Sequence, residues 1–470
     1  MSELLWRRGH ATTSSVRIQV RTDTAGTVTY AGASGKINTD ESVLVLDPLV
    51  EDGTGVVVIE GLSPDQEYTG ILACGAATAE IRFKTRRRGN FRMAWIGCIE
   101  HPRLEGIDLM LAQNPDFCVS LGDFGYNDLA YNSPNNVFGG ETLVGYQVDN
   151  REANCYTTHR AYLRDQNFSK LGHNIDVVDM RDDHQIEDNW DFSIYRANQG
   201  GQLYPAANYT DVNNIFTVLN DCNWNYWRSN PQNTDVDADA GAKYVRWTEG
   251  WDTRRQQPLV EFFLCDHIAY KDIAVTIGGD TALDPTNPAK QFMGETQEDW
   301  LFAHTLASTA TYKVWLFPKQ LFWNLSASNQ DGFVSYTARK DVITAWADAN
   351  DQKIIVLCQD RHDGSVHVSS NFLQVTPCPF GTRNYEGGQG AGYATEAIWK
   401  SNGTDSLPAA DMLTPAAGYY WDQYFGIADF DPDYCTLRIF RVKRARQVWS
   451  CRVAPDSVTP IYSSDGVVGL

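Results

Sequence analysis

The sequence predicts a protein of the α+β or α/β class, in which a small β-sandwich precedes a larger α/β domain. Apolar and polar residues alternate with period two in the first eighty-odd residues, as from Val16 to Arg21 and again from Ala79 to Lys84. This period is typical of strands that have one exposed face. After residue 88 the apolar runs are longer and helical stretches separate them, as expected for strands that are buried on both faces.

The N-terminal segment carries a turn motif and a boundary. The stretch Gly61-Leu-Ser-Pro-Asp-Gln-Glu-Tyr68 resembles the fibronectin type III signature, in which a tyrosine closes the corner between two sheets. The basic run Arg86-Arg87-Arg88-Gly89 follows, and we interpret it as a solvated linker. We therefore expect a fibronectin type III-like sandwich in residues 1–88 and a second domain in residues 89–470. Residues of about 130–154 and 196–257 do not fit the sheet pattern and are predicted insertions.

Charge and hydropathy limit the functions that are open to the chain. Its 470 residues include 59 acidic and 39 basic side chains, which gives a formal net charge of -20. Such a field repels phosphate groups and argues against nonspecific nucleic-acid binding. The sequence has neither an apolar run of about 18 residues that would indicate a membrane span nor an evident export signal. The compartment stays open, with extracellular and particle-associated locations both compatible with the sequence.

The spacing of the cysteines predicts free thiols, and neither a zinc ribbon nor a disulfide framework. None of the ten cysteines belongs to a Cys-x-x-Cys pair, and Cys118, Cys265 and Cys358 lie within apolar runs. We expect these three to be buried free thiols. Cys98 stands apart because it follows a glycine at the end of such a run.

Four apolar runs end in residues that can bind metals or transfer protons. These ends are Gly97-Cys98, Gly122-Asp123, Arg181-Asp-Asp-His184 and Cys358-Gln-Asp-Arg-His362. Ligands of α/β proteins bind at the carboxyl ends of strands, so we expect the four ends to converge. Together with Tyr126 they offer thiolate, phenol, carboxylate and imidazole groups, a set that suits a hard or ferric ion better than a structural zinc. The sequence therefore predicts a metal site.

The order of these blocks resembles that of the PhoD-like alkaline phosphatases of the calcineurin-like metallophosphoesterase superfamily. The blocks read Gly97-Cys98, Gly122-Asp-Phe-Gly-Tyr126, Asp182-Asp-His-Gln-Ile-Glu-Asp-Asn189 and Gln359-Asp-Arg-His362, and the resemblance spans roughly residues 5–370. It implies a domain of two facing sheets flanked by helices. It also implies hydrolysis of phosphate mono- or diesters by a metal-bound hydroxide, with Fe³⁺ and Ca²⁺ as cofactors and other divalent metals as alternatives.

The resemblance also assigns roles by position. The implied metal ligands are Cys98, Asp123, Tyr126, Asp183, Asn189, Asp360 and His362. Iron would lie against Cys98, Asp123 and Tyr126, with Asp360 or His362 completing its shell, and Asp123 would bridge to calcium near Asp183 and Asn189. His184 would face the phosphate oxygen or the leaving group.

Departures from the family pattern indicate an alternative function. The family's Asp-x-Arg-x-x-Arg block reads Asp266-His-Ile-Ala-Tyr-Lys271, so His267 and Lys271 stand where two arginines are expected to hold the phosphate. Neither residue gives a planar bidentate grip. Gln359 replaces a glycine before Asp360, where we expect the backbone to need special torsions. The alternative is a binding or structural protein of a surface or virion, with weak or lost catalysis, that assembles into a larger particle.

Overall fold

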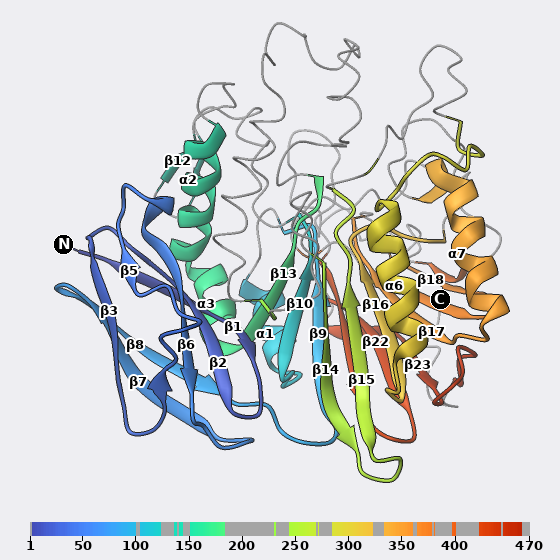
Figure 1. Ribbon diagram of the computed structural model, residues 1–470, viewed down its shortest axis with the longest axis horizontal. Coiled ribbons are helices and arrows are strands. Elements are labelled where there is room, and N and C mark those ends of the chain that lie inside the picture. The colour runs from blue at the N-terminus through green and yellow to red at the C-terminus, as the bar shows by residue number, and fades with distance from the viewer. Residues whose placement is uncertain are drawn as a thin grey trace, which may run out of the picture.

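The N-terminal part of the protein folds into two four-stranded antiparallel sheets that share one core (Figure 1). The computed structural model describes residues 2–99, 104–123, 136–138, 141–143, 151–183, 230–231, 244–268, 271, 284–322, 333–360, 364–377, 380, 397–400, 423–442 and 445–462. One sheet consists of β1 (Leu4–Ala11), β2 (Ser15–Thr22), β6 (Thr54–Glu60) and β4 (Lys36–Ile37). The other consists of β5 (Val45–Leu46), β3 (Gly26–Gly32), β7 (Glu67–Cys74) and β8 (Ala77–Lys84).

The alternating residues of β2 and β8 form the core of this sandwich as predicted. Val16, Ile18 and Val20 are fully buried and belong to one apolar cluster with Ile81 and Phe83. The Tyr68 hydroxyl accepts a hydrogen bond of 2.7 Å from the Ser63 N–H, a contact of the kind that closes a corner between sheets. The assignment to the fibronectin type III group stays a prediction.

The polar face of β2 is buried, so the expectation of an exposed face is wrong for this strand. Gln19 is 0% exposed, and its side-chain oxygen accepts a hydrogen bond from Arg7 of β1. Arg7 in turn forms an ion pair with Asp179 of β13 (Asp176–Met180) in the second domain. Strand periodicity identified the two faces correctly, but a second domain covers the face that a lone sandwich would expose to water.

The boundary segment is likewise part of an interface. Arg86 is 4% exposed and forms ion pairs with Asp176, at 2.6 Å, and with Glu249, at 3.4 Å. Its guanidinium also lies over the Phe117 ring, 4.4 Å from the centroid. The interpretation of this basic run as a solvated linker is therefore wrong at Arg86, because partners distant in sequence compensate its charge.

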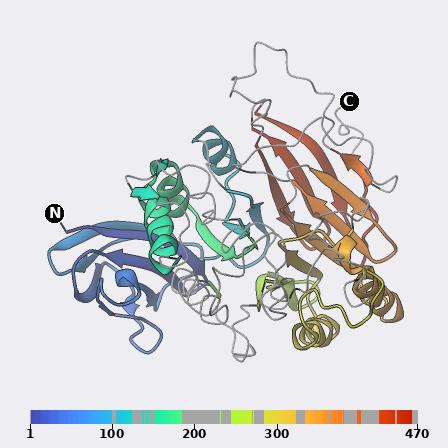
Figure 2. The same cartoon turned by 90° about the horizontal axis from the view of Figure 1, so that it is seen from above.

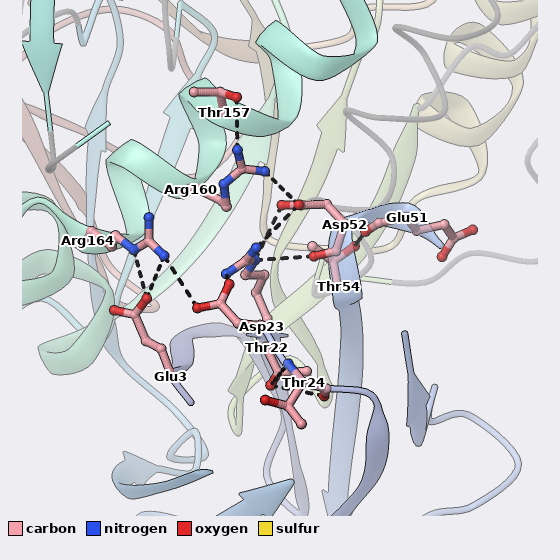
Figure 3. Close-up of polar contacts among 11 residues, drawn as sticks. Glu3, Thr22, Asp23, Thr24, Glu51, Asp52, Thr54, Thr157, Arg160 and Arg164 are labelled. Carbon is pink, nitrogen blue, oxygen red and sulfur yellow. Dashed lines mark hydrogen bonds and ion pairs between the residues drawn. The ribbon is translucent and has the colours of Figure 1, made fainter. Parts of the chain in front are cut away.

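A second group of ion pairs joins the sandwich to helix α2 (Arg151–Arg164) (Figure 3). Arg160 contacts Asp52 at 2.6 Å, and Asp52 lies in η1 (Glu51–Gly53), directly before β6. One turn further on, Arg164 contacts Glu3 at 2.6 Å and Asp23 at 3.6 Å. Both arginines point from one face of the helix, as residues four apart do. The sandwich is therefore fixed against the second domain at several points.

The second domain contains a six-stranded and a seven-stranded sheet (Figure 1). The first has the order β13, β10 (Phe117–Leu121), β9 (Phe91–Ile96), β21 (Tyr424–Phe430), β22 (Cys435–Arg441) and β23 (Arg446–Val453). The second has the order β14 (Val245–Asp252), β15 (Gln257–Leu264), β16 (Tyr312–Phe317), β17 (Ile354–Cys358), β19 (Phe372–Thr376), β18 (Ser365–Val368) and β20 (Ala397–Lys400). Strands β9, β10 and β13 are mutually parallel, as are β15, β16, β17 and β19.

The two sheets pack face to face over an aromatic core, and helices cover their outer faces. Phe91, Phe117 and Phe430 meet Phe262 from the opposite sheet at centroid distances of 5.9 to 6.2 Å. Outer helices are α1 (Leu104–Leu111), α2 and α3 (Gln166–Asn174) on the first sheet, and α6 (Glu295–Ala307) and α7 (Thr337–Ala349) on the second. Figure 2 shows α6 and α7 on the side away from the sandwich. The remaining described elements are β11 (Asn136–Phe138), β12 (Glu141–Leu143) and η8 (Phe333–Tyr336).

The end of the second predicted insertion belongs to the sheet. Residues 245–252 form the edge strand β14, which pairs with β15 in antiparallel register, and Trp247 of this strand stacks on Phe262 in the core. The tryptophans of this stretch suggested an insertion with its own small core, whereas Trp247 packs into the core between the two sheets.

Within the described ranges, no helix combines the length and the hydropathy that crossing a membrane requires.

Candidate metal centre

Four aspartates from the ends of three strands form one buried cluster between the two sheets. Asp123 follows β10, Asp182 and Asp183 follow β13, and Asp360 follows β17 of the opposite sheet. Each offers a carboxylate oxygen, and these oxygens all lie within 4.8 Å of one another. Strand ends that are distant in sequence thus meet at one place, as the sequence predicts. Asp182 belongs to the cluster, although the family resemblance implies a metal ligand only at its neighbour Asp183.

Three residues at these ends have a left-handed backbone. Cys98 has φ 53°, Asp123 has φ 52° and Asp360 has φ 74°. This conformation is uncommon for residues other than glycine, and it costs about 1–3 kcal/mol at each position. It turns the chain sharply directly after β9, β10 and β17, at the three places where the predicted ligands stand.

Gly122 permits the ends of β10 and β13 to approach each other. Its φ is 100°, and a Cβ at this position would lie 2.4 Å from the Cβ of Asp182.

The residue before Asp360 behaves differently from the expectation. Gln359 lacks the left-handed torsion that its replacement of glycine suggested, and Asp360 has it instead.

Cys98 lies against the segment that carries Asp360. Its side chain is fully buried, and its thiol donates a hydrogen bond of 3.3 Å to the Asp360 carbonyl oxygen. The backbone of the same turn is tied to β10, because Cys98 N–H bonds to the Gly122 carbonyl and Ile99 N–H to the Asp123 carbonyl. The thiol therefore lies beside the backbone of the segment that carries Asp360.

Lys319 contacts carboxylates of the cluster, although no sequence motif predicted it. It is fully buried, and its Nζ lies 2.9 Å from Asp183 Oδ1 and 3.1 Å from Asp182 Oδ1. It also forms an ion pair with Asp360. Lys319 comes two residues after β16, so applying the strand-end argument to a fifth apolar run, 312–317, would have found it.

His267 lies at the edge of the cluster. Its Nε2 lies 3.1 Å from Asp182 Oδ1, and its ring stacks on Phe292 with an interplanar angle of 7°. Lys271 is also buried, and its backbone N–H donates to the His267 carbonyl at 3.0 Å. The structure thus places His267 against a carboxylate of the cluster, whereas the role of Lys271 at the phosphate stays a prediction.

Two buried thiols near the site are held in the protonated form. Burial raises the pKa of the Cys265 thiol well above its usual value, and the neighbouring Asp266 adds to the effect. Burial likewise raises the pKa of the Cys358 thiol. The described cysteines are buried and free, as predicted for Cys118, Cys265 and Cys358. Metals bind thiolates, so a thiol held in its protonated form by an apolar environment is a poor ligand.

The donor set fits a cation. Four carboxylates in one small volume, three of them buried, repel one another unless positive charge lies between them, and the Lys319 ammonium supplies one such charge. Oxygen-rich sites suit hard cations such as Ca²⁺, and a neighbouring thiolate suits iron. Four predicted site residues, Tyr126, His184, Asn189 and His362, lie outside the described residues.

The profile of the PhoD-like phosphatase family matches residues 93–382, which is more than half of the chain. The chain belongs to the PhoD-like phosphatase family. The match contains every strand end that contributes to the acidic cluster. Phosphatases of this family act on phosphate esters and depend on metals, and the cluster is where this PhoD-like chain could bind them.

A solved structure described as "Structure of PhoD" shares the fold. It aligns with a TM-score of 0.68 at 17% identity, and the alignment covers 98% of this chain and 93% of that chain. A second structure, "GAP50 the anchor in the inner membrane complex of Plasmodium", aligns with a TM-score of 0.37 at 10% identity over 78% of this chain and 90% of that chain. This similarity is too weak to support an argument. No curated protein matches the sequence.

Proposed function

We propose that this PhoD-like protein hydrolyses phosphate mono- or diesters with cations held in its acidic cluster. The observation that carries the proposal is the convergence of Asp123, Asp182, Asp183 and Asp360 within the region that matches the family. The Lys319 ammonium supplies one positive charge to these four carboxylates, and further cations would lower the cost of burying them, so the cluster favours a role in binding cations.

Among the described residues, Cys98, Asp123, Asp183 and Asp360 would hold the ions, with Asp182 beside them. We assign Tyr126, Asn189 and His362 to the same shell from the family resemblance. When bound, the cations would polarise a water for attack on phosphorus and neutralise the phosphoryl oxygens. The family resemblance implies Fe³⁺ and Ca²⁺ as these ions.

The protein's own side chains would orient this centre and supply the proton. His267 holds Asp182 in place through the contact of 3.1 Å between Nε2 and Oδ1. Such partners of metal ligands fix the orientation of the carboxylate. His184 follows Asp183 directly, and we assign to it the transfer of a proton to the leaving-group oxygen. We assign to Lys271 a contact with the phosphate, in place of an arginine.

The test is turnover of nitrophenyl phosphate and bis(nitrophenyl) phosphate by the full chain, before and after treatment with a chelator. We expect chelation to abolish turnover and metal addition to restore it. Asp123→Asn should lower kcat at least 100-fold, because a shared ligand is lost while asparagine tolerates the left-handed backbone at this position. Asp284→Asn, in an exposed turn, is the control and should leave turnover unchanged.

Full metal occupancy by elemental analysis without turnover of either ester would refute the catalytic proposal. It would favour the alternative, a binding or structural protein on the same scaffold. That alternative predicts a larger assembly, so elution of the chain as a monomer in size-exclusion chromatography would argue against it.

A further inference from the structure

A cavity with a volume of 540 Å³ lies between the sandwich and the second domain. Three segments line it: the end of β1 with the turn that follows, the connection between β8 and β9, and the second half of β14. The connection runs along the lower edge of the view in Figure 1. Sites for small molecules typically have volumes of about 300–1,000 Å³. The charged and aromatic residues of the lining are His10, Arg86, Arg87, Arg88, Glu249 and Trp251.

This cavity lies at the opposite end of the strands from the acidic cluster. Arg86 pairs with Asp176 at 2.6 Å and lies over the ring of Phe117, and these two residues begin β13 and β10. Asp182 and Asp123 follow the ends of the same two strands. Since a strand rises about 3.3 Å per residue, the two places are about 20 Å apart. A small ligand in the cavity would therefore not contact the acidic cluster.

Backbone contacts bring the three lining segments together. The Arg86 N–H donates to the Thr12 carbonyl oxygen at 2.9 Å, which joins the connection to the sandwich. On the other side, Gly250 lets β14 approach the connection, because a Cβ at this position would lie 2.4 Å from the Gly89 carbonyl oxygen. The walls of the cavity therefore come from both domains.

The Arg86 side chain has contacts on two of its three nitrogens and keeps one donor unused. Its Nη1 donates to Asp176 Oδ2 at 2.6 Å and to the Asp116 carbonyl oxygen at 2.5 Å, and its Nε donates to Glu249 Oε1 at 3.4 Å. The residue is 4% exposed, and its Nη2 has no hydrogen-bond partner in the described part of the chain. A buried charged donor without a partner is unfavourable, so an acceptor supplied by a ligand would bind there.

The charged residues around the cavity include more arginines than carboxylates. Arg87 pairs with Asp116 at 2.5 Å, and its Nε is a second buried donor without a partner among the described residues. The residues of this network are Arg8, Arg86, Arg87 and Arg88 against Asp116, Asp176 and Glu249. In a chain with a formal net charge of -20, a local excess of positive charge favours an anionic ligand at this place.

We propose that this cavity binds a nucleoside phosphate. The unused donors of Arg86 and Arg87, with the exposed Arg88 beside them, would hold the phosphate, because guanidinium groups match the geometry of phosphate oxygens. Trp251 lines the cavity and is 41% exposed, so its ring would stack on the base. A volume of 540 Å³ suits an organic ligand better than a bare oxyanion.

The test is isothermal titration calorimetry of the full-length protein with a phosphonate analogue of AMP, whose P–C bond a phosphoesterase does not hydrolyse. We expect the analogue to bind more tightly than adenosine or inorganic phosphate, because it alone contacts both the arginines and Trp251. The double variant Arg87→Gln/Arg88→Gln should raise the Kd of the analogue at least about tenfold, since two charged donors are lost. Arg82→Gln is the matched control and should leave the Kd unchanged, because this exposed arginine of β8 pairs with Glu67 outside the cavity lining.

Two single variants separate the contact with the phosphate from the contact with the base. Arg88→Gln changes an exposed side chain, so it should fold as the wild type does and raise the Kd of the analogue about threefold. Trp251→Leu should weaken binding of the analogue and leave that of inorganic phosphate unchanged.

Three results would overturn the inference. They are no binding of the analogue, binding no tighter than that of inorganic phosphate, and a Kd that the arginine and tryptophan substitutions leave unchanged. Binding at the acidic cluster would give the last of these results, because none of the substituted residues belongs to that cluster. The proposed catalytic function stands or falls separately, since it rests on the acidic cluster alone.

Discussion

Arg181 and Asp266 form a completely buried ion pair that joins the two sheets beside the acidic cluster. Arg181 follows β13 of one sheet and Asp266 follows β15 of the other, and both side chains are 0% exposed. The Arg181 Nε lies 3.0 and 3.2 Å from the two carboxylate oxygens, so both oxygens are engaged. The pair therefore holds the strand end that carries Asp182 and Asp183 against the opposite sheet.

Removing one partner of this pair should destabilise the protein strongly. Asp266→Ala removes the carboxylate that faces a fully buried guanidinium, and breaking a buried ion pair from one side costs about 3–5 kcal/mol. We expect this loss in the free energy of unfolding from urea titrations. The matched control is Asp433→Ala, which removes the exposed ion pair with Arg254 and should have no measurable effect. Equal effects of the two substitutions would contradict the prediction.

The interface between the sandwich and the second domain should respond to acid through His173. The His173 ring stacks on Trp6 of β1 at 4.2 Å, and its Nε2 lies 3.1 Å from the Trp6 carbonyl oxygen. Burial lowers the pKa of His173, although the hydrogen bond to Trp6 partly opposes the shift. An unfolded histidine has a pKa of about 6.5, so unfolding takes up a proton below that pH.

We therefore expect the contribution of His173 to stability to be complete above pH about 6.5 and to fall as the pH drops toward the lowered folded pKa. The measurement is the urea midpoint of wild type and His173→Gln at pH 7.5 and pH 5.5. The wild type should lose more stability between these two values than the variant does. The same loss in both proteins would show that His173 does not carry the effect.

The buried thiols should resist modification in the folded protein. Burial raises the pKa values of Cys118 and Cys435 well above the usual range, and nearby carboxylates add to both shifts. Alkylation requires the thiolate, so iodoacetamide at pH 8 should leave both residues intact in the native state. Both should react fully in guanidinium chloride, as peptide mass spectrometry would show. Rapid native labelling of Cys118 would contradict the structure around β10.

Much of the candidate site could be predicted because its residues follow apolar runs that are easy to recognise. Cys98, Asp123, Asp183 and Asp360 each come two or three residues after a strand whose end the sequence predicts to within a residue. Lys319 also follows such a strand, but a single lysine after an apolar run has the pattern of any solvated strand end. Only its burial among carboxylates from other strands distinguishes it.

The buried polar face of β2 and the burial of Arg86 could not be predicted from local pattern. Period-two alternation shows that a strand has two different faces, and does not show what covers the polar one. Asp179 pairs with Arg7, which contacts Gln19 of β2, and Asp176 pairs with Arg86. Both aspartates lie in β13, more than eighty positions later in the sequence. Contacts between domains depend on these distant partners and leave no periodic signal.

His267 should support metal binding through Asp182. A side chain that orients a metal-ligating group typically contributes a factor of about 10–100 in metal affinity. We expect His267→Gln to raise the Kd for the bound metal by that factor, measured by competition with a chromogenic chelator. His304→Gln, on α6, is the control and should leave the Kd unchanged. An unchanged Kd in His267→Gln would show that its contact with Asp182 is structural only.

Gly122 offers a test of how closely the two strand ends must approach. Gly122→Ala adds a Cβ that would lie 2.4 Å from the Asp182 Cβ, at a residue with φ 100°. Gly61→Ala is the matched control, because Gly61 also has a positive φ, 77°, but has no atom within 4 Å of the added Cβ. The added backbone strain should lower the free energy of unfolding of the control by about 1–2 kcal/mol. The control should bind metal as the wild type does. Gly122→Ala should lose more stability and bind metal more weakly, since the clash pushes the turn that carries Asp182 and Asp183 away from Asp123. Equal stability and equal metal affinity in the two variants would mean that the cluster does not depend on this close approach.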